Sequence, residues 1–148
     1  MRSLWLCIVA SLLVACGGRT ALAELAPKEA CWKISNRIEV NISHPGGTLD
    51  LPVELALTAE YPFSNLYLKA TLKSGIGVDT SWTMTKTFVD PLGNWLVAEK
   101  AGSYRVNYDI LRKQDFPAGD YTISLGHNMR PERVCGVEVV RLLAPPQK

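Results

Sequence analysis

The sequence of 148 residues contains no motif of a known catalytic site. It has only two histidines and lacks the Gly-x-Ser-x-Gly elbow of hydrolases, a phosphate-binding P-loop and a calcium-binding loop. His44 precedes Pro-Gly-Gly and His127 continues a strand-like segment, and neither has a nucleophile or a second metal ligand near it in the sequence. We therefore expect no enzymatic activity, no metal and no cofactor. An enzyme would require folding to bring His127 to a carboxylate.

Clustered positive charge is also missing. Lys and Arg total 16 against 14 Asp and Glu, for a formal net charge of +2. The basic residues are dispersed along the chain and are not interleaved with stacking aromatic residues, as they are in many nucleic-acid-binding surfaces. We therefore expect no nucleic-acid partner.

Only one long apolar run is present, from Leu4 to Ala15, and it follows the positively charged Arg2. A helix needs roughly 20 apolar residues to cross a bilayer, so this run is too short to span one. Its length and polarity are typical of a secretory leader, and we predict that the chain is exported. Any membrane attachment must then come from a lipid.

Two cleavage sites are possible after this run. Leu13-Val14-Ala15-Cys16 resembles a bacterial lipobox, which predicts residues 1–15 as the signal peptide and a lipid on the thiol of Cys16. Residues 16–30 would then form an anchor and a tether. The alternative is ordinary cleavage after Ala23, directed by the small residues of Ala21-Leu22-Ala23. We favour Cys16, because the second site would leave a long polar gap that carries Arg19.

The mature chain keeps two further cysteines, Cys31 and Cys135. In an oxidising compartment they can form a disulfide, which would stabilise the fold by up to about 4 to 5 kcal/mol in the chain-entropy model. The alternative is two separately buried thiols. A metal site is a weaker interpretation, since neither cysteine has a further ligand at the usual spacing.

Strict alternation of apolar and polar residues dominates residues 31–144, the predicted folded domain. Short segments of period two are separated by Gly, Pro, Asn and Asp turns, which is typical of half-buried antiparallel strands. We predict an all-β antiparallel sandwich of seven to eight strands, Ig-like or jelly-roll-like, with a closed barrel as the alternative. A single helical turn is considered within 108–115, and residues 145–148 are expected to fray. The predicted strands cover residues 32–42, 49–57, 66–72, 82–88, 95–98, 104–110, 121–125 and 137–143.

Most aromatic residues share a register with aliphatic ones and are predicted to fill the core, among them Trp82 with Phe88 and Tyr104 with Tyr108. Tyr67 has the opposite register to Leu66 and Leu68, which places it on the outer face. An exposed aromatic residue is a candidate for protein contact. It could equally stack on a glycan.

Four ordered phrases carry a family resemblance. Behind the lipobox, the chain contains in this order Tyr61-Pro62-Phe63-Ser64-Asn65-Leu66-Tyr67-Leu68, Asp90-Pro91-Leu92-Gly93-Asn94-Trp95-Leu96, Phe116-Pro117-Ala118-Gly119-Asp120-Tyr121-Thr122-Ile123, and His127-Asn128-Met129-Arg130 with Val134-Cys135-Gly136-Val137. Over about Tyr61 to Leu143 the chain resembles the gliding-motility lipoprotein family GldH. It departs from that pattern in having Val97 where a Gly is expected after Trp-Leu, and in the pair Cys31 and Cys135.

The resemblance implies a non-enzymatic lipoprotein of the cell envelope, linked to the movement of surface adhesins and to the secretion system that serves them. It implies attachment to the outer membrane, facing the periplasm, and partners among other envelope proteins. No catalytic residue is carried over. Gly93 and Gly119 are expected to serve turns, and Trp95, Tyr121 and Met129 are expected to serve packing. The candidates for partner contact are Tyr67, Trp95, Met129 and Arg130.

Overall fold

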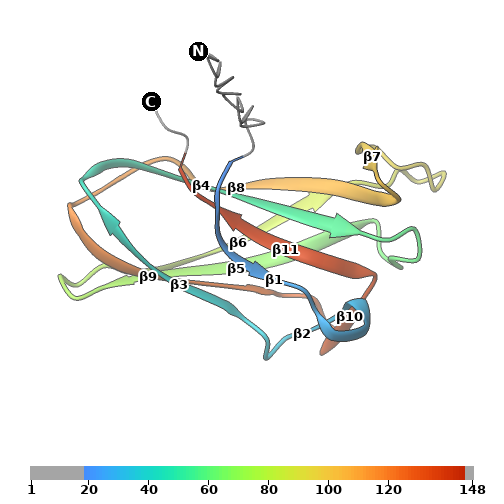
Figure 1. The fold of residues 1–148 in the computed structure, drawn as a ribbon, viewed down its shortest axis with the longest axis horizontal. Coiled ribbons are helices and arrows are strands. Elements are labelled where there is room, and N and C mark those ends of the chain that lie inside the picture. Colours follow the sequence, from blue (N-terminus) through green and yellow to red (C-terminus); the bar gives the residue numbers. More distant parts are fainter. Residues whose placement is uncertain (1–18, 146–148) are drawn as a thin grey trace, which may run out of the picture.

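A computed structural model describes residues 19–145, with only the backbone for Arg112 and Lys113. The predicted signal peptide, Cys16 and residues 146–148 lie outside the described residues. Nearly all of the described chain is strand (Figure 1). The elements are β1 (Ala21–Leu25), a 3-10 turn η1 (Lys28–Ala30), β2 (Cys31–Lys33), β3 (Ile38–His44), β4 (Gly47–Leu57), β5 (Asn65–Ser74), β6 (Asp79–Thr87), β7 (Glu99–Lys100), β8 (Ser103–Phe116), β9 (Gly119–His127), β10 (Arg133–Cys135) and β11 (Val137–Leu143).

Two curled antiparallel sheets face each other, in strand orders β1-β11-β4-β8-β7 and β3-β9-β5-β6, and β2 pairs with β10 in a separate ribbon. The predicted all-β antiparallel sandwich is confirmed. Alternating residues of β4, β5 and β9 point inward, as the period of two requires. Their apolar side chains form one core between the sheets, in which Trp32, Leu55, Leu68, Phe88 and Ile123 are almost fully buried.

The chain enters the fold earlier than the sequence predicted. β1 begins at residue 21, not 31, and pairs with β11 from Ala21–Leu143 to Leu25–Val140. Arg141 of β11 donates a hydrogen bond to the Glu24 carboxylate at 2.7 Å, which ties the two strands together. The predicted tether 16–30 is therefore wrong for residues 21–30. Ala, Leu and Glu are not among the residues that favour strands, so the sequence of this segment did not predict one. The pairing with β11 determines its structure.

The candidate helical turn in 108–115 is also wrong, because this segment belongs to β8. The apolar residues that suggested a helix lie at a β-bulge. The register with β4 shifts from Leu49–Gln114 to Leu51–Ile110, and Leu111 adopts a left-handed backbone conformation with φ of 61°. A bulge inserts extra residues into one strand and bends it, so consecutive residues of β8 can both be buried there.

The predicted return strand 95–98 is reduced to one bridge, between Val89 and Trp95. The N–H of Leu96 donates to the carbonyl of Phe88 at 2.8 Å, which closes the loop between β6 and β7.

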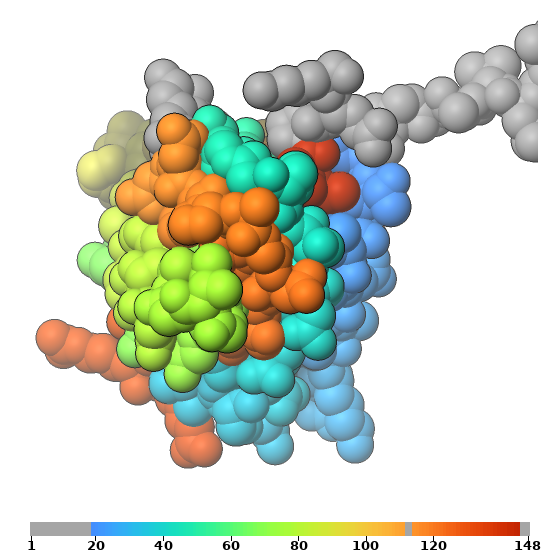
Figure 2. Space-filling model, turned by 90° about the vertical axis from the view of Figure 1, so that its left-hand side faces the viewer, coloured from blue at the N-terminus to red at the C-terminus, as the bar shows by residue number. Residues whose placement is uncertain are grey.

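The two ends of the sandwich differ. At the terminal end lie the β3–β4, β5–β6 and β8–β9 turns, and β1 starts beside the end of β11; Figure 2 looks onto these turns, which lie side by side. At the opposite end lie the β2–β10 ribbon and the residues that follow β9. We call this the disulfide end, because Cys31 and Cys135 pair there.

Candidate functional site

Three of the four predicted contact residues come together in a groove at the disulfide end. Tyr67 stands on the outer face of β5, where 39% of it is exposed, and Met129 and Arg130 follow β9. The groove has a volume of about 530 Å³. Its lining consists of Phe63, Tyr67, Thr83, Asn128, Met129, Arg130 and Pro131.

Hydrogen bonds hold the wall of this groove, residues 128–131, against β5. The N–H of Asn128 donates to the carbonyl of Tyr67 at 2.7 Å, which extends the β5–β9 ladder by one step. The N–H of Tyr67 approaches the sulfur of Met129 at 3.3 Å. Met129 is half-buried, whereas Arg130 is exposed. The arrangement presents an aromatic ring, a thioether and a guanidinium group on a fixed backbone.

His127 lies beneath the groove wall and is 1% exposed. Its Nδ1 accepts a hydrogen bond from the N–H of Met129 at 3.3 Å, and its ring meets the Trp32 ring edge-to-face at 5.3 Å. Burial lowers the pKa of His127 below its ordinary value of 6.5, because the imidazolium form would lose its hydration. The imidazole is therefore neutral at pH 7 and supports the wall.

Trp95, the fourth predicted contact residue, lies outside the groove. Its ring stacks on Tyr104 with centroids 3.8 Å apart and on Phe88 at 5.7 Å. These two stacked contacts give Trp95 a packing role. The exposed apolar side chains of this loop are Leu92 and Leu96 instead, at 87% and 62% exposure.

The turn before Trp95 is held by Asp90. Its carboxylate accepts hydrogen bonds from the N–H groups of Leu92 and Asn94, at 2.9 and 2.8 Å, and from the Asn94 side chain at 3.0 Å. The hydrogen bonds from Asn94 contribute most to lowering the pKa of Asp90, because they stabilise the carboxylate. Gly93 adopts a φ of +88°, as the predicted turn requires.

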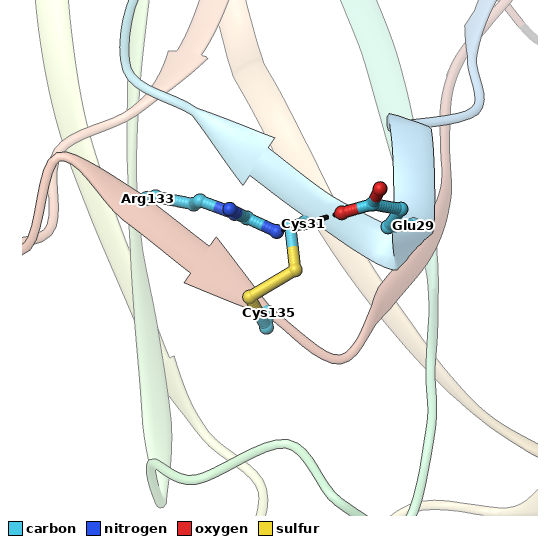
Figure 3. The surroundings of a disulfide bond; sticks show 4 residues. All are labelled: Glu29, Cys31, Arg133 and Cys135. Carbon is cyan, nitrogen blue, oxygen red and sulfur yellow. Dashed lines mark hydrogen bonds and ion pairs between the residues drawn. A yellow bond between two sulfur atoms is a disulfide. The ribbon is translucent and has the colours of Figure 1, made fainter.

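Cys31 and Cys135 form a disulfide across the β2–β10 ribbon, where they lie directly opposite each other. Beside it, Arg133 of β10 forms an ion pair with Glu29 of η1 at 3.1 Å (Figure 3). Gly136 follows with a φ of +87°, and a Cβ there would lie 2.7 Å from the Cα of Tyr61. The ribbon is thereby fixed closely to the main body.

The two histidines do not share a site. His44 pairs in register with Gly119 at the start of β9 and His127 ends that strand, which separates them by roughly 27 Å at the usual strand rise. No group of three potential metal ligands lies together within the part of the chain that the structure describes. Likewise, no helix in residues 19–145 is long and apolar enough to cross a membrane.

Sequence reasoning missed four residues of the groove, namely Phe63, Thr83, Asn128 and Pro131. Two of them stood inside the phrases that carried the resemblance. Asn128 directly precedes Met129, and Phe63 stands in the same phrase as Tyr67, so the sequence placed both near predicted contact residues. Only the pairing of β5 with β9 brings the two phrases together.

Comparison with known families gives one match. The family model described as GldH lipoprotein matches residues 24–142, from within β1 to the penultimate residue of β11. The match thus extends over most of the chain and includes residues 24–30 of the segment that the sequence had assigned to a tether. No curated protein matches the sequence.

Proposed function

The chain belongs to the GldH lipoprotein family, the lipoproteins associated with gliding motility, and from this membership we propose a role within the motility machinery. The protein is a non-enzymatic accessory or scaffold component of the gliding-motility apparatus and of the secretion system associated with it. The groove at the disulfide end docks another envelope protein.

The position and composition of the groove carry this proposal. Its lining combines Phe63, Tyr67, Met129 and Arg130, and aromatic residues, Met and Arg are the types enriched at protein interfaces. The groove lies at the end opposite to the start of β1, so a membrane anchor at the N-terminus leaves it accessible. Docking buries the rings and pairs the guanidinium group of Arg130 with a carboxylate of the partner.

The proposed anchor is the lipidated Cys16, five residues before β1 begins at Ala21. Five extended residues reach at most about 18 Å, so the domain stays close to the membrane surface. Two or three acyl chains make the attachment effectively permanent. Confinement to the surface of the outer membrane, facing the periplasm, raises the effective concentration for partners there.

The docking role is tested by a double substitution, Tyr67→Ala with Arg130→Ala, in the chromosomal copy. We expect gliding and export of surface proteins to fall, and recovery of partner proteins from solubilised membranes to fall about tenfold or more, as for loss of an interface hot spot. The matched control is Ile76→Ala, which changes a 61% exposed apolar residue in the β5–β6 turn at the terminal end. Normal gliding in the double variant, at normal protein levels, would contradict the role of the groove.

The anchor is tested separately. Cys16→Ser should release the protein from the membrane fraction, because the thiol is the attachment point of the lipid. Continued membrane fractionation of this variant after a high-salt wash would show that the attachment does not depend on Cys16.

Glycan binding is a second candidate function, favoured by the exposed ring of Tyr67 with the Asn128 amide and Arg130 beside it. Such a set could stack on a sugar and bind its acetamido or carboxylate groups. Titration of the purified protein with soluble muropeptides tests this directly. Saturable binding that Tyr67→Ala abolishes would support the glycan, whereas no binding at millimolar concentrations leaves the protein partner as the better explanation.

A further inference from the structure

The four-stranded sheet ends in a strand whose outer edge is open. β6 pairs with β5 over nine residues, from Asn65–Thr87 to Lys73–Asp79, without any register shift. Within residues 19–145, no other strand pairs with it. A long regular edge presents a row of free N–H and C=O groups, which natural proteins usually block.

The hydrogen-bond pattern shows which residues of β6 face outward. The N–H of Phe88, just after the strand, donates to the carbonyl of Ser64 on the β5 side at 2.9 Å. In an antiparallel ladder the direction alternates with each residue, so even-numbered residues of β6 bond to β5. The odd-numbered residues Ser81, Thr83 and Thr85 therefore direct their backbone N–H and C=O groups to the open edge.

The other long strand on this side of the sandwich has a blocked edge. In β8, the N–H of Arg105 donates to Ala98 and the carbonyl of Asn107 accepts a hydrogen bond from Lys86 at 3.1 Å. Farther along, the bulge at Leu111 interrupts the edge. An edge of this kind does not offer a continuous row of groups to another strand.

On the far side of the sandwich, β1 is only five residues long, has an irregular register and lies against β3. Between them these two strands cover the core on that side. β3, the other edge of the four-stranded sheet, also has a regular register, but it pairs over seven residues and lies against β1. Within the described fold, β6 is thus the longest regular edge without a neighbouring strand on its outer side.

The side chains around β6 indicate what an added strand would carry. Trp82 and Met84 are only half-buried, and with Leu111 they line a cleft of about 230 Å³ between the two sheets. A strand beside β6 would place every second side chain over this cleft. Apolar residues at those positions would complete the burial of Trp82 and Met84, while the alternate positions would lie beside Thr83 and Thr85 on the polar outer face.

The described part of the chain does not supply this strand. Its first and last strands, β1 and β11, lie on the other side of β4 from β8. A second copy of the chain is the other candidate occupant of this edge. The groove favours a different partner, because Thr83 belongs both to β6 and to the groove lining, and a segment held in the groove can continue along the edge.

We propose that β6 binds an extended segment of another envelope protein by strand addition, with alternating apolar and polar residues and its apolar side over Trp82, Met84 and Leu111. The choice of a different partner rests on the proposed docking role of the groove; the open edge does not. Thr83 also lines the groove at the disulfide end, so the added strand would run into the surface that contains Tyr67. Backbone pairing supplies the affinity, and the alternating side chains supply the specificity.

The open edge itself is tested on the purified full-length lipoprotein by amide hydrogen exchange. Ser81, Thr83 and Thr85 should exchange freely, whereas Trp82 and Met84 should be protected by β5. Equal protection of both sets would show that the edge is already covered, and would overturn the proposal.

Binding is tested in living cells with a photo-crosslinking residue at position 85 of β6, and at Thr122 on the same face of the central strand β9 as a control. Ser81→Pro removes one outward N–H without touching the β5 ladder, at a position outside the groove where an edge strand tolerates proline. We expect it to lower the yield of the crosslink from position 85 by about tenfold, a loss near 1.4 kcal/mol, whereas Ser81→Ala keeps the N–H and the yield.

The crosslinked peptide of the partner, identified by mass spectrometry, should alternate in polarity and should be absent from the Thr122 control. Equal yields for Ser81→Pro and Ser81→Ala, or crosslinks only to lipid or to a second copy, would overturn the proposal. The outcome is separable from that of the groove. Loss of partner recovery in the double variant Tyr67→Ala with Arg130→Ala, together with an unaffected Ser81→Pro, rejects strand addition alone, and the reverse pattern rejects the groove alone.

Discussion

At the scale of single residues, His127 links burial to acid sensitivity. Its folded-state pKa is lowered by burial, so the unfolded chain binds the proton more readily and stability falls as the pH drops below 6.5 towards the folded value. Protonation also removes the Nδ1 acceptor of the Met129 N–H. We expect the free energy of unfolding to decrease between about pH 7.5 and pH 5, and to decrease less in His127→Gln, as measured by urea denaturation. The Asp90 and Glu60 carboxyls, whose pKa values lie below 3.8 and 4.5, lose their contribution only at lower pH.

Trp95 and Leu92 belong to one loop but make very unequal contributions to stability. Trp95→Ala removes a ring stacked on Tyr104 and Phe88 and should destabilise the protein by about 2 to 3 kcal/mol. Leu92→Ala should change stability by less than about 0.5 kcal/mol, since the side chain is 87% exposed. Chemical denaturation of both variants measures the difference. Equal effects would contradict the packing role of Trp95.

The exposure of Tyr67 could be predicted from its position between Leu66 and Leu68, because a period of two assigns faces directly. The stack around Trp95 could not, since Phe88 follows β6 of one sheet and Tyr104 belongs to β8 of the other. The groove could not be predicted for the same reason. Its residues come from β5 and the segment before it, from β6 and from the segment after β9, and no local pattern records which strands become neighbours.

At the scale of elements, the disulfide closes a long loop through two very short strands. Cys31 and Cys135 are 104 residues apart and join strands of only three residues each. In the chain-entropy model a loop of this length is worth about 4 to 5 kcal/mol. We therefore expect dithiothreitol to lower the urea midpoint of the wild type. The variant with Cys31→Ala and Cys135→Ala should have a similarly low midpoint that does not respond to the reductant.

The strongly alternating elements were predictable and the atypical ones were not. β4, β5 and β9 show clear alternation in sequence and lie in the centre of their sheets. β1 is an edge strand of small and helix-favouring residues, whose structure depends on β11 and on the Glu24–Arg141 contact. At the bulge in β8, consecutive apolar residues are both buried, and in the sequence this pattern resembled that of a helical turn.

At the scale of the whole molecule, β1 bears on where the chain is cleaved. Cleavage after Ala23 would remove the pairing partners of Leu142 and Leu143, together with half-buried Leu22. Cleavage before Cys16 leaves β1 intact. We therefore expect the mature protein isolated from membranes to begin at Cys16 and to carry the mass of its acyl chains, as measured by mass spectrometry of the N-terminal peptide.

The same argument predicts a difference in stability between two shortened chains made without lipid. A chain that begins at residue 24 lacks three residues of β1 and exposes the β11 edge, which should cost about 1 to 3 kcal/mol relative to a chain that begins at residue 17. Urea denaturation of both chains measures this difference, and a start at residue 20 is the control because β1 begins at Ala21. Equal stability of the chains from 17 and 24 would mean that β1 adds nothing to the fold, and the structural objection to cleavage after Ala23 would disappear with it.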